Sequence, residues 1–165
     1  MNGAYVHLLL NHIPVVGFPV CFFLLLAGNL RQSRDLVQAG YICLVVFGLV
    51  TYPVWKSGGP AAHILRGNPD VTHEAIHEHA EAAEFGAIAG GICGVIGLLG
   101  WGLMRRPQGA PKWMIALALI ITLWASTVMA RVAHLGGLIR HPEIEADAKA
   151  PAMMMQMQPK DHPPQ

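Results

Sequence analysis

The sequence has 165 residues, of which 53% are hydrophobic and only 13% are charged, and its mean hydropathy is positive at +0.43. That composition excludes an ordinary soluble domain and indicates an integral membrane protein. The formal net charge of +1 excludes the strongly basic surface of a nucleic-acid-binding protein. No phosphate-binding glycine loop follows a strand and no nucleophile stands out beside a base, so we do not expect the chain to catalyse a reaction by itself.

Four apolar stretches are each long enough to cross about 30 Å of hydrocarbon as a helix. They cover residues 13–30, 36–54, 85–104 and 113–133. We therefore predict an all-α, integral membrane four-helix bundle over residues 1–144, followed by an extended tail rich in methionine and proline over residues 145–165. No basic segment precedes the first stretch and no small-residue cleavage site follows it, so we expect this stretch to remain as a span.

Two histidines, His7 and His12, bracket an apolar turn just before the first span. Pro14 and Pro19 lack the N–H that a helix interior needs, so we expect them to bend the first helix near one membrane face. A bend frees backbone carbonyl groups, which Asn11 or His12 could satisfy.

The first and third connections, residues 31–35 and 105–112, are short and basic. Together they hold five of the eleven Lys and Arg residues and a single acid, Asp35. Because short basic loops stay in the cytoplasm, we predict a bacterial inner-membrane protein with both termini and the second connection in the periplasm. All nine histidines then lie on the periplasmic side: His7, His12, His63, His73, His77, His79, His134, His141 and His162.

The second connection begins with Ser57, two glycines and Pro60, a composition that predicts a turn. We expect residues 61–67 to form a short helix on the membrane surface. His63 and Arg66 would then face the same aqueous layer as the polar segment that follows.

That polar segment, residues 72–85, holds three of the nine histidines and runs directly into the third span. Asp70 or Thr72 can cap its start, and no glycine or proline interrupts it before Gly86, so we predict one continuous helix. At about 100° per residue, His77 and His79 point roughly 200° apart and cannot bind one metal ion together. One face carries His73, His77, Glu81 and Glu84, and the opposite face carries Ala75, Ile76, His79, Ala82, Ala83, Gly86 and Gly90.

The third and fourth spans both carry small residues. Gly86, Gly90 and Gly94 form a stripe that allows close approach of another helix or leaves room for a flat macrocycle. If the fourth helix persists to Arg140, a small-residue face on it would be the counterpart of the His79 face, comprising Thr127, Ala130, His134, Gly137 and His141. Arg131 lies near the membrane boundary on this helix and needs an acidic partner, for which Glu81 and Glu84 are the candidates.

The sulfur-containing residues suggest two different interpretations. Cys21, Cys43 and Cys93 lie inside spans without a metal-binding or haem-attachment spacing, so we interpret them as buried structural thiols. The tail carries four methionines and a histidine, a soft donor set that could bind Cu(I): Met153, Met154, Met155, Met157 and His162.

The histidine layer favours a b-type haem, because imidazole is a common axial ligand of haem iron. Such a site needs ligands on facing helices, small residues that admit the ring, and cations near the propionates. The candidate ligands are His7, His12, His79, His134 and His141, and the candidate cations are Arg66, Arg131 and Arg140. The same histidines suit copper, iron or zinc. An alternative metal site would use the acidic helix face with His73, His77, Glu81 and Glu84, whose other interpretation is a solvated helix end.

Three segments resemble an uncharacterised family of four-helix bacterial membrane proteins, a domain of unknown function in which some members are suspected b-type cytochromes. The resemblance covers about residues 4–144. It rests on His7-x4-His12-x-Pro14, on Ile76-x2-His79-Ala80-Glu81-Ala82-Ala83, and on Gly136-Gly137-Leu138-Ile139-Arg140-His141-Pro142-Glu143-Ile144. The resemblance implies that His7, His12, His79 and His141 are the site residues. Outside the family pattern are His63, His73, His77, His134 and the Met-rich tail.

Three functional hypotheses follow. The first is an electron-transfer subunit of a larger redox complex that binds one or two b-type haems at its periplasmic face and exchanges electrons with a periplasmic cytochrome or copper protein. The second is a copper, iron or zinc site built from the same histidines and the Met-rich tail. The third is a cofactor-free accessory subunit whose glycine faces serve assembly in the lipid membrane.

Overall fold

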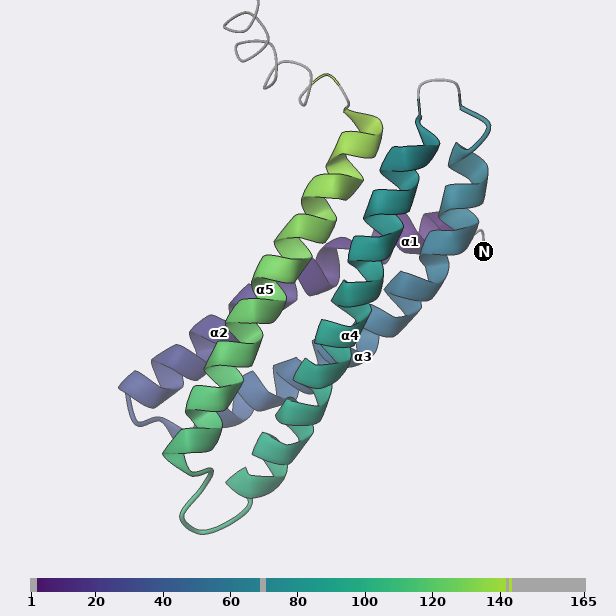
Figure 1. The fold of residues 1–165 in the computed structure, drawn as a ribbon. Helices are drawn as coiled ribbons and strands as arrows, with labels where there is room; N and C mark the ends of the chain where they lie inside the picture. The colour runs from purple at the N-terminus through teal and green to yellow at the C-terminus, as the bar shows by residue number, and fades with distance from the viewer. Residues whose placement is uncertain (1–2, 69–70, 142, 144–165) are drawn as a thin grey trace, which may run out of the picture.

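The computed structural model describes residues 3–68, 71–141 and 143, and in this part of the chain the regular structure is entirely α-helical, as predicted (Figure 1). The predicted tail over residues 145–165, with its methionines and His162, lies outside the described residues. The helices are α1 (Gly3–Leu10), α2 (His12–Leu30), α3 (Arg34–Leu65), α4 (His73–Met104) and α5 (Lys112–Arg140).

The four long helices form a bundle in which each packs against its neighbours in the chain, and α5 also packs against α2 to close the ring. The short helix α1 crosses behind α4 in the view of Figure 1 and packs against α3. Four segments are long and apolar enough to cross a membrane, with α1 and α2 together counting as one from Gly3 to Leu30. The predicted four-helix bundle is therefore confirmed.

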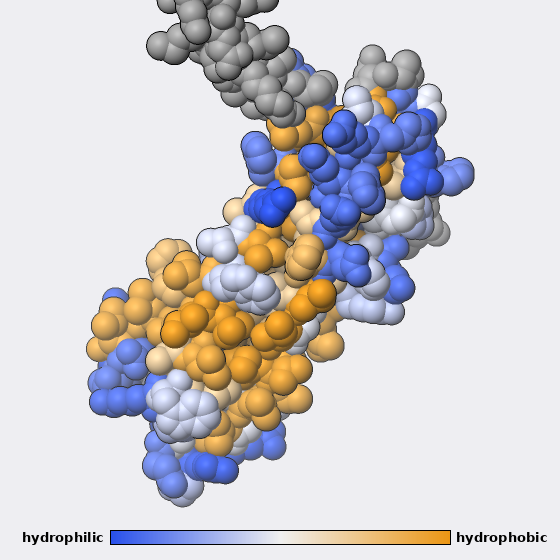
Figure 2. Space-filling model, in the orientation of Figure 1, coloured by the Kyte–Doolittle hydropathy of each residue, from blue (hydrophilic) through white to orange (hydrophobic). Residues whose placement is uncertain are grey.

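Large apolar side chains cover the outside of the bundle as well as its core. Phe23, Leu49, Phe85 and Val95 are all more than half exposed. Figure 2 shows hydrophobic residues over the lower half of the visible face, with hydrophilic residues at the lower tip and over the upper end. Lipid, not water, is the solvent that such a surface requires, so the chain is a multi-pass membrane protein.

Glycines allow α3 and α4 to approach closely in the bundle centre. A Cβ atom added to Gly48 would lie 2.7 Å from the carbonyl oxygen of Gly90, and one added to Gly90 would lie 2.7 Å from Oγ1 of Thr51. The predicted glycine stripe on the third span thus serves helix packing. Cys21 and Cys93 are buried in this core and Cys43 is partly buried, all as free thiols.

Arg34 fastens the end of the bundle that carries the two basic loops, which we call the basic end. Its guanidinium group donates hydrogen bonds to the carbonyl oxygens of Met104, Arg106 and Pro107, at 2.6, 2.8 and 2.5 Å. These acceptors lie where α4 ends, and the last carbonyl groups of a helix receive no hydrogen bond from an N–H within that helix. One side chain therefore joins the start of α3 to the connection between α4 and α5.

The turn predicted at Ser57–Pro60 is wrong, because α3 continues through it to Leu65. The residues expected to form a separate surface helix are the last turns of α3. Pro60 removes one helical N–H donor, but α1 packs beside it: a Cβ on Gly3 would come within 2.7 Å of the Pro60 side chain. The packing of α1 thus outweighs the local preference for a turn.

Two other local predictions have clear outcomes. Thr72 caps α4, its hydroxyl accepting a hydrogen bond from the backbone N–H of Ala75 at 3.2 Å, and the helix runs unbroken to Met104 as predicted. The first helix is interrupted at Asn11, between α1 and α2, whereas Pro19 lies within α2. Pro14 has no N–H to bond the carbonyl of Leu10, and α1 ends at that residue.

Candidate functional site

Two of the predicted histidines meet at the end of the bundle opposite the basic end, which we call the histidine end. His7 is carried by α1 and His79 by α4, and their ring centroids lie 6.4 Å apart with the ring planes at 88°. Both residues are half-buried. The pair exists because α1 packs on α3, which brings His7 to a position that the chain order alone does not indicate.

The His7 ring is held by α3. Its Nδ1 atom lies 3.1 Å from the carbonyl oxygen of Val54 and 3.2 Å from Oγ of Ser57. The Ser57 hydroxyl itself donates to the Val54 carbonyl at 2.7 Å, which leaves its oxygen free to accept. Because a carbonyl can only accept, Nδ1 of His7 carries the hydrogen, and Nε2 of the neutral ring carries the lone pair.

The His79 ring is held in the same way by α5. Its Nδ1 atom lies 3.1 Å from the carbonyl oxygen of Val132, so Nδ1 again donates and Nε2 again carries the lone pair. Gly136, one helical turn further along α5, makes room for the ring. A Cβ atom at Gly136 would lie 3.0 Å from Cε1 of His79, closer than ordinary van der Waals contact.

This arrangement is the one that metal-binding histidines adopt, with one ring nitrogen donating to a carbonyl and the other available as a ligand. A metal–nitrogen bond of about 2.0–2.1 Å places an imidazole centroid about 3 Å from the metal. Two imidazoles on opposite sides of one ion are then about 6 Å apart, and two at a tetrahedral angle about 5 Å. The observed centroid separation, 6.4 Å in an edge-type ring contact, is closer to the first of these two spacings.

The other predicted haem residues lie on the surface. His12 at the start of α2 is exposed, as are His134, Arg131 and Arg140 on α5. His141 follows α5, and its Nδ1 atom lies 2.9 Å from the carboxylate of Glu143. Hydrogen bonds from its own backbone N–H and from His141 lower the pKa of Glu143.

The small-residue face predicted for the fourth span is wrong. The helix persists to Arg140, but the five residues of that face point outward and are exposed: Thr127, Ala130, His134, Gly137 and His141. The inward face carries Met129, Val132 and Gly136, and Gly86 on α4 faces Met129 and Val132. At this contact a glycine on α4 packs against large side chains on α5. The small residues of α5 therefore do not mark the side of the helix that faces α4.

The two faces predicted for α4 are confirmed. His73, His77, Glu81 and Glu84 are exposed, whereas Ile76, Ala82, Gly86 and Gly90 on the opposite side are buried and His79 is half-buried.

The exposed face shows one short contact, between Nε2 of His77 and a carboxylate oxygen of Glu81 at 3.2 Å. Within residues 3–68, 71–141 and 143, no three His, Cys, Asp or Glu side chains gather closely enough to hold a metal ion. The ion pairs in the same part of the chain are His77–Glu81 and His141–Glu143, so the predicted pairing of Arg131 with Glu81 or Glu84 is wrong.

Sequence reasoning missed the groups that orient the two rings. Ser57 was assigned to a turn, so its hydroxyl was not considered as an acceptor for a histidine ring. The carbonyls of Val54 and Val132 carry no sequence signal, because every residue has one.

Comparison with protein-family models, with curated proteins and with solved structures found no match to this chain.

Proposed function

We propose that the protein is a membrane-embedded b-type haem protein that serves as an electron-transfer subunit of a larger redox complex, with His7 and His79 as the axial ligands. The observation that carries the proposal is the His7–His79 pair, with centroids 6.4 Å apart and each Nδ1 bound to a backbone carbonyl. Bound haem would supply one-electron oxidation and reduction at its iron.

A glycine lies beside each ring of the pair, so no side chain from that position presses on either ring. His79 has a glycine, Gly136, against its ring, and Gly58 lies beside His7, where an added Cβ would sit 3.7 Å from Cε1. The carbonyl bonds hold both rings in one orientation, and in the neutral ring they place the lone pair on Nε2, the atom that would bind iron. Preorganised ligands also reduce the rearrangement that accompanies electron transfer.

The charge distribution supports a location near the periplasmic face of a bacterial inner membrane. The basic end carries Arg31, Arg34, Arg105 and Arg106 and would lie in the cytoplasm, with both termini on the other side. A haem at the histidine end lies near one membrane face, so it would exchange electrons with a periplasmic cytochrome, a copper protein or a neighbouring subunit. It would not carry them across the bilayer alone.

The test is a dithionite-reduced minus oxidised visible spectrum of the purified protein, with metal analysis of the same sample, after expression with haem available. We expect a b-type α-band and stoichiometric iron. His7→Ala and His79→Ala should each lose that spectrum, and His77→Ala, which is exposed on the opposite face of α4, should retain it.

A featureless spectrum would refute the haem proposal. Bound copper, zinc or non-haem iron would then favour the simple metal site. Without metal, the two rings would form only the edge-to-face contact of neighbouring aromatic groups, and the chain would be an accessory subunit.

A further inference from the structure

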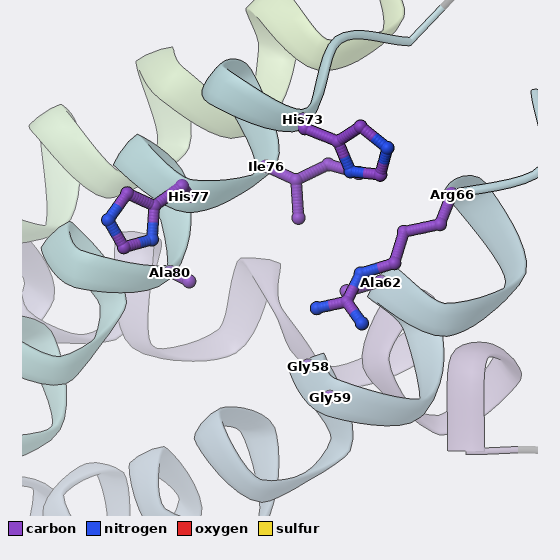
Figure 3. A pocket seen from close by; sticks show the side chains of 8 residues that line it. All are labelled: Gly58, Gly59, Ala62, Arg66, His73, Ile76, His77 and Ala80. Atoms are coloured by element: carbon purple, nitrogen blue, oxygen red, sulfur yellow. The ribbon is translucent and has the colours of Figure 1, made fainter. Parts of the chain in front are cut away.

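A groove separates the end of α3 from the start of α4, with a volume of about 370 Å³. That volume lies in the range of small-molecule sites, about 300–1,000 Å³. In Figure 3, the Arg66 side chain extends from α3 over the groove, His73 and His77 lie on the α4 wall, and Gly58 and Gly59 lie on the α3 side.

The groove is open because the residues beneath its polar rim are small. Gly58, Gly59 and Ala62 on α3 and Ala80 on α4 supply almost no side-chain volume. A Cβ atom added to Gly59 would meet no other atom within 4 Å. The two helices therefore leave a space that a ligand can enter without moving either of them.

The polar side chains that line the groove favour an anion. Arg66 presents a permanent positive charge with several N–H donors, and His73 adds a ring that can donate. None of the described residues that line the groove is acidic. Glu81 contacts the outer side of the wall through His77, so Arg66 and His73 are the principal donors.

An aromatic anchor on α3 places the groove at the level of lipid headgroups. The Nζ atom of Lys56 lies 4.5 Å from the ring centroid of Trp55 and 5.8 Å from that of Tyr52. Tryptophan, tyrosine and lysine of this kind mark the membrane–water interface. At about 100° per residue, Trp55, Gly59 and Arg66 share one stripe of α3, so the groove continues from the anchor toward the water.

We propose that this groove binds the phosphate of an anionic lipid headgroup, with Arg66 as the main ligand and His73 as a second donor. The acyl chains would lie along the stripe beside Tyr52 and Trp55, toward the apolar belt. Arginine binds phosphate through paired, charge-assisted hydrogen bonds, and basic pockets between membrane helices are suited to such headgroups. The inference does not depend on the haem proposal.

The experiment titrates the full-length protein in detergent with phosphatidylglycerol, phosphatidylcholine or inorganic phosphate, and measures the bound fraction by native mass spectrometry. Arg66→Gln removes the charge, and Gly59→Leu fills the groove without changing charge. Arg140→Gln is the matched control, because Arg140 is exposed at the same end of the bundle and does not line the groove. The visible spectrum of each variant is recorded in parallel.

We expect phosphatidylglycerol to bind more tightly than phosphatidylcholine, with about tenfold weaker binding in Arg66→Gln and Gly59→Leu and none of this loss in Arg140→Gln. Equal retention of phosphatidylglycerol by all four proteins would overturn the proposal. Binding of inorganic phosphate without lipid, lost in the same two variants, would reject the lipid and assign the groove to a soluble phosphate. Loss of a haem spectrum in Arg66→Gln would also overturn it, because the groove would then hold haem propionates.

Discussion

Gly136 and Gly137 are adjacent on α5, but a methyl group added at Gly136 would press on His79, whereas one added at Gly137 would meet no other atom. At Gly136 the new Cβ would lie 3.0 Å from Cε1 and 3.3 Å from Nδ1 of His79. Carbon atoms in favourable contact are about 3.5–4.0 Å apart, so the ring must shift by about half an ångström. At Gly137 the new Cβ meets no atom within 4 Å.

The shift at Gly136 acts on the hydrogen bond between His79 and the Val132 carbonyl, which is 3.1 Å long. Loss of one such bond costs about 1 kcal/mol, so we expect Gly136→Ala to weaken haem binding by about fivefold. Gly137→Ala should leave haem binding unchanged and stabilise the helix by about 0.5–1 kcal/mol, because alanine has less conformational freedom to lose than glycine.

The assay is a haem titration of the apoprotein, followed by the visible spectrum, with thermal unfolding of the same two variants. Equal haem affinity in both variants would refute the role of Gly136. Weakened binding in Gly137→Ala alone would show that α5 faces His79 with a different side.

Three further changes test the packing and the ligand orientation. Ser57→Ala removes one of two acceptors for Nδ1 of His7 and should weaken haem binding by no more than about fivefold, measured by the same titration; a complete loss of haem would contradict the role of the Val54 carbonyl. Gly90→Leu inserts a side chain where α3 and α4 touch and should destabilise the bundle by about 1–3 kcal/mol in thermal unfolding, whereas Gly91→Leu, which faces open space, should not. Arg34→Gln removes hydrogen bonds to three carbonyls and should lower the free energy of unfolding by about 1–3 kcal/mol, measured by thermal unfolding, without changing haem binding.

The fold could be predicted from the sequence because its signals are local and strong. Long apolar stretches require spanning helices, and the 3.6-residue period on α4 placed His79 inward and His77 outward correctly. The cap at Thr72 depends on neighbouring residues alone, and Thr72 was one of the two caps predicted, with Asp70.

The candidate site was less predictable because it depends on contacts between distant segments. His7 was a candidate among five histidines, and only the packing of α1 on α3 selects it as the neighbour of His79. The turn predicted at Ser57 was wrong because the prediction used local residue preferences alone and did not include the packing of α1 on α3. The prediction of which side of α5 contacts α4 was wrong because Gly86 on α4 packs against Met129 and Val132, so the contacting side of α5 is not its small-residue side.

The most direct test of the central claim is electron paramagnetic resonance of the oxidised, haem-loaded protein, comparing the wild type with His79→Ala. Two imidazole ligands on one ferric haem would give a low-spin signal, whereas a single imidazole would leave the iron high-spin. The account predicts that signal in the wild type and its replacement by a high-spin signal, or loss of haem, in His79→Ala. A wild-type high-spin signal, or an unchanged low-spin signal in His79→Ala, would contradict axial ligation by His7 and His79.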